Sequence, residues 1–303
     1  LIDKYNPATA SVPEPQGRPE LDRWILSELN TLIQQVTERL DNYDPTTAGR
    51  AIADFVDNLS NWYVRRSRRR FWKSENDSDK LAAYATLYGC LVSVSKLLAP
   101  FIPFMAEEMY QNLVRSVYPE APESVHLADY PVANTRMIDQ NLSLKMAVVR
   151  DSVSLARSAR ESAQIKVRQP IQAVRVWVDN VAIKGFLEQS RDLVREEVNT
   201  ENLTAWDLGN ETERNALAEY VSFNNKLNLK ICGLRLREKA PIFQKALEKM
   251  DSFKTAFDVI NGNEIVINGE RFSPSEILTE VIGKKGYAAK ASGKHIVVID
   301  ETI

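Results

Sequence analysis

The sequence predicts a mainly α-helical protein, in which an antiparallel helical bundle is followed by a small mixed α/β domain. Two observations carry this prediction. Apolar residues recur at spacings of three and four through the first half, which is typical of amphipathic helices. The pattern then changes to alternation with β-branched residues over IQAVRVWV, 171–178, which indicates a strand. The 303 residues suffice for one large or two ordinary domains.

The predicted domains follow these changes of pattern. Residues 1–20 are rich in proline and polar groups and predict a linker. The helical bundle is predicted over 21–165, with a boundary near Gln164–Gln169. The α/β domain is predicted over 166–303, and the sequence leaves open whether that domain is complete.

Five helices with short links are expected in the bundle. Asp44-Pro45 separates the first two, because aspartate suits an N-cap and proline suits the first helical position. The third ends at Ala99-Pro100, where proline lacks a donor. The expected ranges are 21–43, Pro45 to Trp72, 79–98, 103–114 and 136–163.

Fewer elements are predicted in the second domain. Besides strand 171–178, we expect helices within 182–198 and 241–251. A short strand is expected at 264–267, and a hairpin over 287–299 that turns at Ser292-Gly293-Lys294.

The composition and the motifs exclude several classes of protein. With no run of about 18 apolar residues, no membrane span is expected, and the N-terminus does not have the form of a signal peptide. The chain lacks an initiator methionine, which favours a fragment of a longer protein. The two cysteines and two histidines are isolated, so we expect no metal site and interpret Cys90 and Cys232 as buried apolar residues of a cytoplasmic protein. Common nucleotide-binding and hydrolase motifs are absent.

One stretch stands out in a chain whose net charge is only −2: NWYVRRSRRRFW, 61–72. It has five arginines within six positions at the end of the second predicted helix. The helix dipole favours one or two cations there, by about 0.3–1 kcal/mol each. Like charges at i, i+4 destabilise an isolated helix. An anionic partner should therefore offset the repulsion.

Two interpretations of these arginines fit equally well. They can pair with acidic helices of the same protein, as charge runs usually do. They can also bind phosphates, whose oxygens the guanidinium fork matches. A membrane surface fits less well, because the helix lacks a wide lysine-rich face.

The flanking aromatic residues are interpreted mainly as core. Trp62 falls on the apolar stripe of its helix. Phe71 and Trp72 can stack on a base at the helix end, although core packing is favoured for both.

Further basic residues lie outside this stretch. A cluster at the domain boundary contains Arg157, Arg160, Lys166 and Arg168, and its interpretation as an interdomain salt-bridge patch is slightly favoured. More cations are spread through 226–239 and 284–290. Cationic patches in separate places favour a polyanion of extended reach.

Three strings resemble the anticodon-binding helical domain of class I aminoacyl-tRNA synthetases: LDRWILSELNTLI, YDPTTAGRAIADFVDNLSNWYVRRSRRRFW and LLAPFIPFMAEEMYQNLV. Within that group, NWYVRRSRRRFW and ARSARESAQIKVRQPI resemble the isoleucyl-tRNA synthetase family. The resemblance covers about 21–171 strongly and continues weakly to 203 and over 224–238.

The resemblance implies a tRNA-binding, C-terminal part of a cytoplasmic ligase that joins isoleucine to its tRNA with ATP and magnesium. The catalytic and editing domains would precede this part. The two ATP signatures of the catalytic domain are absent, and Lys249-Met250-Asp251-Ser252 only mimics one of them. The chain alone should therefore be inactive and carry no cofactor. Its expected partners are isoleucine tRNA and the parent's own domains, with no membrane and no DNA.

Anticodon recognition requires splayed bases that stack on aromatic or guanidinium planes, with phosphate contacts that set the register. We expect the arginine run to hold the backbone, and polar residues of the second domain to help read bases. The predicted RNA-binding residues are Arg65, Arg66, Arg68, Arg69, Arg70, Trp72, Lys73, Lys166, Arg168, Asn224, Asn225, Lys226 and Arg235.

A second hypothesis comes from another class of function. The chain can instead be a protein-interaction or interdomain scaffold, whose basic helix end docks onto another protein part. Internal pairing of the cations from Arg65 to Lys73 would favour the scaffold, whereas an open cationic surface would favour RNA.

Overall fold

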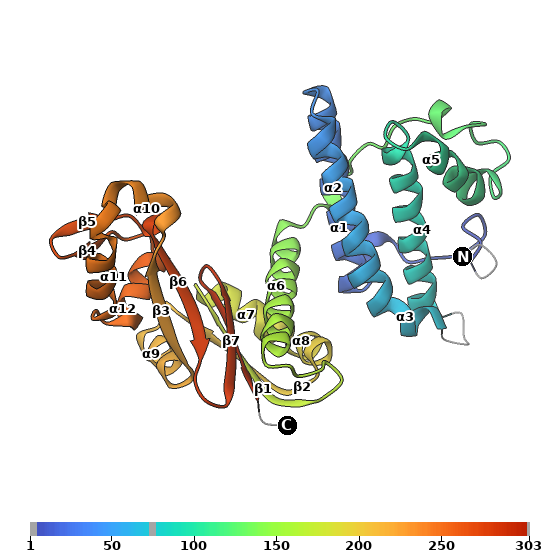
Figure 1. The fold of residues 1–303 in the computed structure, drawn as a ribbon. Coiled ribbons are helices and arrows are strands. Elements are labelled where there is room, and N and C mark those ends of the chain that lie inside the picture. Colours follow the sequence, from blue (N-terminus) through green and yellow to red (C-terminus); the bar gives the residue numbers. More distant parts are fainter. Residues whose placement is uncertain (1–4, 73–76, 302–303) are drawn as a thin grey trace. The chain divides into compact units, whose positions relative to one another are not determined.

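The computed structural model describes residues 5–72 and 77–301, which form two compact units, Leu1–Leu144 and Lys145–Ile303 (Figure 1). The fold class predicted from the sequence, a helical domain followed by a small α/β domain, is confirmed. The units divide at 144/145, whereas the sequence suggested 165/166. Most of the last long helix is therefore grouped with the second unit, whose strands and helices its side chains contact.

The first unit contains the helices that the apolar spacing predicts. Two of them are extended by π-helical segments, Leu59–Val64 between α2 and α3, and Gln111–Arg115 after α5. The α-helices of this unit are α1 (Glu20–Asp41), α2 (Pro45–Asn58), α3 (Arg65–Trp72), α4 (Ser78–Leu98) and α5 (Pro103–Tyr110).

Helices α1, α2 and α4 form the centre of this unit (Figure 1). Trp24, Ile52 and Leu97 are almost completely buried there. By length and composition alone, α4 is apolar enough to cross a membrane, which the sequence analysis did not expect. Its contacts with α1, α3 and α5 instead make it a core helix of the bundle.

The second unit combines several helices with three small sheets. Helix α6 (Gln140–Ser162) leads into it from the first unit. The other helices are α7 (Val181–Gln189), α8 (Arg191–Val198), α9 (Glu211–Tyr220), α10 (Leu229–Leu236), α11 (Ala240–Glu248) and α12 (Ser252–Ile260). The strands are β1 (Ile171–Val178), β2 (Thr200–Asp207), β3 (Val221–Leu227), β4 (Ile265–Ile267), β5 (Glu270–Phe272), β6 (Ile277–Gly283), β7 (Tyr287–Ser292) and β8 (His295–Asp300).

The largest sheet has the strand order β2-β1-β8-β7. Strand β1 pairs parallel to β2 and antiparallel to β8, and β7 with β8 forms the predicted hairpin. Six of the eight residues of β1 are buried, as expected for a central strand covered on both faces. Strands β3 and β6 form a separate antiparallel ribbon, and β4 with β5 forms a small hairpin.

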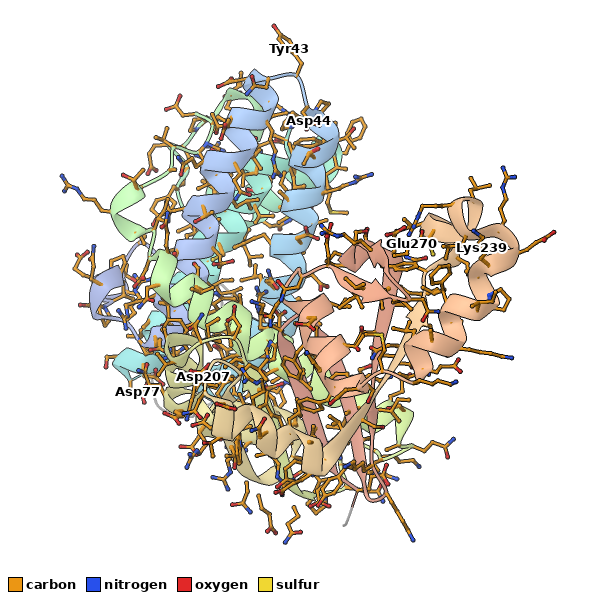
Figure 2. All side chains as sticks on the ribbon, turned by 90° about the vertical axis from the view of Figure 1, so that its left-hand side faces the viewer. Tyr43, Asp44, Asp77, Asp207, Lys239 and Glu270 are labelled. Atoms are coloured by element: carbon orange, nitrogen blue, oxygen red, sulfur yellow. The ribbon has the colours of Figure 1, made fainter. Side chains whose placement is uncertain are left out.

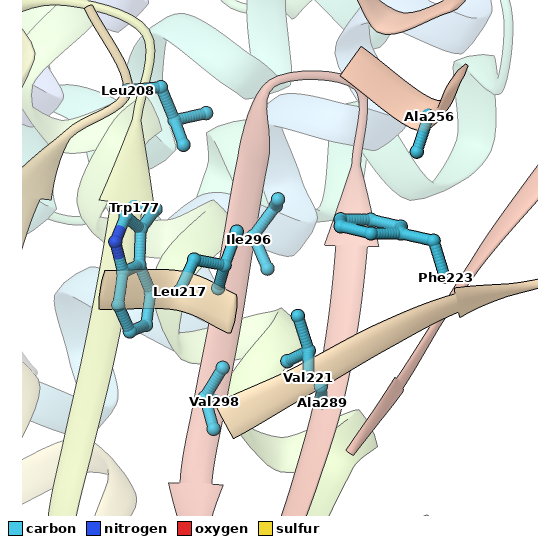
Figure 3. Packing of buried hydrophobic residues seen from close by; sticks show 9 residues of the cluster. All are labelled: Trp177, Leu208, Leu217, Val221, Phe223, Ala256, Ala289, Ile296 and Val298. Carbon is cyan, nitrogen blue, oxygen red and sulfur yellow. The ribbon is translucent and has the colours of Figure 1, made fainter. Parts of the chain in front are cut away.

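A core of aromatic and aliphatic side chains joins the main sheet to the β3–β6 ribbon. Figure 3 shows Trp177 beside Leu217 and Ile296, with Val221 and Phe223 of β3 closing the other side. The Trp177 indole donates its hydrogen bond to the backbone carbonyl of Glu213, so the largest buried side chain leaves no polar atom unsatisfied.

Gly283, at the end of β6, is required by close packing. A Cβ atom there would lie 2.0 Å from the carbonyl oxygen of Tyr287. Replacing it with alanine should therefore lower the free energy of unfolding by about 1–3 kcal/mol or more, as overpacking does. Urea denaturation measures this. Gly185→Ala, in a helix with nothing within 4 Å, should instead stabilise the chain slightly. Equal effects of both substitutions would contradict the packing argument.

His295 links β8 to α6, since its Nε2 lies 2.8 Å from the Ser152 hydroxyl oxygen. Burial lowers the pKa of His295 below its usual 6.5, against the opposing charges of Asp151 and Asp179. The unfolded chain then binds the proton more readily than the folded chain. Stability should therefore fall as the pH drops from about 6.5 through the lowered pKa. The free energy of unfolding against pH measures this, and His295→Gln should flatten the decline.

Candidate nucleic-acid interface

A π-helical segment sets the direction in which the arginine run points. Along α2 the buried positions are Ala48, Ile52 and Phe55, followed by Leu59 in the π segment. A continuous α-helix would bring Trp62 next to the core, as the sequence analysis expected. The wider π turn, marked by the bond from the Arg65 N–H to the Ser60 carbonyl, shifts the inward positions by one residue.

Tyr63 and Ser67 therefore occupy the inward positions and are fully buried. Trp62 is only half-buried, so its predicted core role is corrected. The same shift keeps the charged side chain of Arg66 from pointing directly into the core, since Ser67 takes that place.

Arg70 is bound inside the first unit. Its Nη1 and Nη2 atoms lie 2.6 and 2.8 Å from the two carboxylate oxygens of Asp22, and Nη2 also donates to the Asp79 carbonyl. The Tyr63 hydroxyl donates to the same Asp22 carboxylate at 2.8 Å. Burial lowers the pKa of Arg70, but the hydrogen bonds and charge of Asp22 outweigh it and raise the pKa overall. For this arginine, the interpretation as an internal ion pair is the one the structure supports.

The other arginines of α3 are disposed differently. Arg65, Arg68 and Arg69 are exposed and Arg66 is half-buried. Among the residues that the structure describes, Arg68 and Arg69 form no ion pair with a carboxylate. We call Arg65, Arg68, Arg69 and Trp72 the arginine patch.

Trp72 contributes an exposed aromatic ring to the arginine patch. It is 76% exposed, and the Arg68 guanidinium lies 5.4 Å from its ring centroid. The expected core role of Trp72 is therefore wrong, while Phe71 packs on Tyr84 at 5.0 Å between ring centroids. Lys73, also predicted to bind RNA, lies outside the described residues.

The basic cluster after α6 is held by a buried arginine. The Arg160 guanidinium donates to the carbonyls of Lys166 and Gln169 on one side and of Val198 and Asn199 on the other. Burial lowers the pKa of Arg160. Arg157 pairs with Glu197 at 2.6 Å, which is a salt bridge within the second unit and not the interdomain one that the sequence analysis favoured.

Lys166 and Arg168 lie on the loop that Arg160 ties down, and both are exposed. The hydrogen bonds from Arg160 to these four carbonyls join the loop to the end of α8. Lys166 and Arg168 therefore lie on an ordered turn. They remain candidates for RNA contact.

The predicted base-reading residues of the second unit do not form one surface. On β3, the exposed Lys226 and half-buried Asn224 face away from the core, whereas Asn225 is buried. The amide of Asn225 donates to the Ser252 carbonyl at 2.8 Å and accepts from the Thr279 hydroxyl. Arg235 is held by Glu270 and by Glu276, the latter at 2.7 Å. Asn225 and Arg235 thus already have partners within the unit.

Sequence reasoning missed the partners of Arg70. Asp22 is an acid next to the apolar stripe of the first helix, and its 0% exposure is the feature that fixes α3. An acidic residue beside a core-facing stripe, in a chain that also has an arginine run, was the signal in the sequence that could have predicted this ion pair. The predicted first helix, 21–43, is also too long at its end, since α1 ends at Asp41 and Tyr43 is 93% exposed.

Comparison with known proteins identifies this architecture. Residues 22–175 match the family of anticodon-binding domains of tRNA ligases. The chain belongs to this family. The match runs from α1 through all the bundle helices into β1, so it includes both the arginine patch and the loop tied down by Arg160.

The chain has curated relatives that are isoleucine–tRNA ligases, which confirms the resemblance seen in its sequence. It is 58% identical to the protein of Dehalococcoides mccartyi over 209 residues, covering 69% of this chain and 20% of that protein. With Thermus thermophilus it shares 42% over 288 residues, covering 93% and 27%. With Clostridium novyi it shares 37% over 308 residues, covering 100% and 28%. The chain therefore spans between a fifth and about a quarter of these relatives.

The two kinds of arginine in α3 should respond differently to mutation. Arg70→Ala would leave the buried Asp22 carboxylate without its counter-ion, which should lower the free energy of unfolding by about 3–5 kcal/mol. Arg69→Ala, on the exposed side of the same helix, should change it by no more than about 0.5 kcal/mol. Urea denaturation compares the two. Similar small effects would show that the Asp22 pair does not anchor α3.

Proposed function

We propose that this chain is the tRNA-binding, C-terminal part of a cytoplasmic isoleucine–tRNA ligase, and that it binds the anticodon stem-loop of isoleucine tRNA. The observation that carries the proposal is the arginine patch. Arg68 and Arg69 present their guanidinium groups to solvent beside the exposed Trp72, while Arg70 is bound internally. The relatives' names supply the amino acid and the reaction.

In this role the arginine patch binds phosphate oxygens, and Trp72 offers a ring on which a base or ribose can stack. Lys166 and Arg168 add a second cationic contact from the loop after α6. Phosphate contacts of this kind set the register of the RNA and carry no sequence information themselves.

The chain would support aminoacylation without performing it. Joining isoleucine to tRNA with ATP and magnesium, and editing, would take place in domains that the sequence resemblance puts before this part. Among the described residues, no group of three or more His, Cys, Asp or Glu side chains could hold a metal ion. On its own it should be inactive.

A double substitution tests the arginine patch. Replacing Arg68 and Arg69 by alanine should weaken binding of isoleucine tRNA and reduce the slope of log K against log salt by about 0.7–0.9 per lost phosphate contact. Fluorescence anisotropy at several salt concentrations measures the slope. The matched control removes two exposed arginines of the second unit, Arg191 and Arg271, and should leave the slope unchanged.

The outcomes of this titration separate RNA binding from a scaffold role. An unchanged slope in the patch variant would assign these arginines to contacts with other protein parts, as Arg70 already is within the first unit. A tRNA with another anticodon provides the second comparison. Equal affinity for both tRNAs would mean that this chain binds phosphates but does not read the anticodon bases.

A further inference from the structure

Tyr43 is held in a strained conformation and yet its side chain packs on nothing. Its φ is 58°, in the left-handed region that favours glycine and that is an outlier for a bulky residue. Its side chain is 93% exposed. Figure 2 shows Tyr43 projecting from the tip of the α1–α2 hairpin, beyond the neighbouring Asp44.

The left-handed conformation follows from how the two helices are capped. At the end of α1, the Asp44 N–H donates to the Arg39 carbonyl at 2.8 Å and the Tyr43 N–H donates to the Leu40 carbonyl at 3.0 Å. This is a Schellman motif, whose left-handed position falls on Tyr43 and usually carries glycine. The Asp44 carboxylate then accepts from the Thr47 N–H and caps α2. The short link is therefore rigid, and it displays the ring outward.

Such strain persists where the side chain has a use outside the fold. The described residues give the ring no stacking partner and the hydroxyl no hydrogen bond, so its contribution to the fold is unfavourable. The last turn of α1 also lines a hollow of about 390 Å³, to which Leu40 and Asp41 contribute together with Lys96 and His126. The lining thus combines apolar side chains with a few charged ones. An aromatic ring on a rigid tip that follows this turn suits a flat partner with polar edges, such as a base.

We propose that Tyr43 is a stacking platform for an unstacked base of single-stranded RNA. This inference rests on the proposed function and extends it to a site that the sequence analysis did not consider. Lys96 supplies a cation at the hollow for the adjoining phosphate, and the exposed ring supplies the stacking surface, which accepts any base.

The location of Tyr43 makes this contact independent of the arginine patch. It lies before the start of α2, and the patch lies at the far end of the continuous helix from Pro45 to Trp72. At about 1.5 Å per residue, these 28 positions separate the two sites by roughly 40 Å. A loop base at Tyr43 and a backbone phosphate at the patch are therefore separate contacts of the RNA, which substitutions can test one at a time.

Substitutions at Tyr43 distinguish the contribution of the ring to RNA binding from the cost of the backbone strain to stability. Tyr43→Gly and Tyr43→Asn both suit the left-handed conformation and remove the ring, so each should raise the melting temperature by a few degrees. Each should also weaken binding of a short hairpin RNA with the isoleucine anticodon loop by about 5- to 150-fold, the range expected for one stacked base. Tyr43→Phe should bind as the unchanged chain does. Leu234→Ser, which removes an apolar side chain that is 91% exposed in the second unit, should have no effect.

The full chain is used throughout, and binding is measured by anisotropy of the labelled hairpin and of a duplex RNA without a loop. Hairpin binding that Tyr43→Gly weakens and Tyr43→Phe preserves supports the proposal. Hairpin binding that Tyr43→Gly leaves unchanged overturns it, while the arginine patch still accounts for tRNA binding. An equal loss for duplex RNA also overturns it, because no base is unstacked there. A chain that binds neither hairpin nor tRNA overturns this inference and the proposed function together.

Discussion

The buried carboxylate of Asp22 is the point on which the helical unit depends. It comes from the first turn of α1 and accepts hydrogen bonds from Arg70 of α3 and from Tyr63 of the π-helical segment. A charge so buried is stabilising only with its partner in place, because an unpaired carboxylate in the interior is strongly unfavourable. The pair therefore selects the position of α3, and with it the direction of the exposed arginines.

This arrangement explains how two interpretations of one arginine run can both hold. Within α3, Arg70 takes the internal role, and its guanidinium is shared between Asp22 and Asp79. Arg68 and Arg69 face solvent on a helix that is already anchored. A cationic surface placed on an anchored helix is preorganised, so that less conformational entropy is lost when an anion binds. The internal pairing of Arg70 and the proposed phosphate binding are therefore compatible within the same eight residues.

Much of the fold could be predicted from the sequence, because helical periodicity and proline punctuation are local signals. The helices of the bundle, strand β1 and the β7–β8 hairpin follow from them. Strands β2, β3, β5 and β6 and helices α9, α10 and α12 were missed. Within β3, for instance, Asn225 occupies an inward position and interrupts the apolar alternation that marks a strand.

The candidate site was predictable in composition but not in detail. The density of arginines pointed to α3, whereas the roles of Arg70, Asn225 and Arg235 depend on partners distant in sequence, such as Asp22, Thr279 and Glu270. Long-range pairing of this kind has no local signature. The role of Tyr43 was also not predictable from the sequence, because only its backbone φ shows that it occupies a position suited to glycine.

The direction in which the arginine patch faces depends on how the segment Leu59–Val64 is wound, and not only on which residues it contains. If the same residues formed a regular α-helix, everything downstream would turn by about 100°. Arg66 would then face the core in place of Ser67, and the Asp22 pair would be out of reach. In a related chain that is one residue shorter in this segment, a regular α-helix would keep the same downstream face, because the π turn takes up one extra residue. An insertion, in contrast, would change where the guanidinium groups point without altering a single arginine.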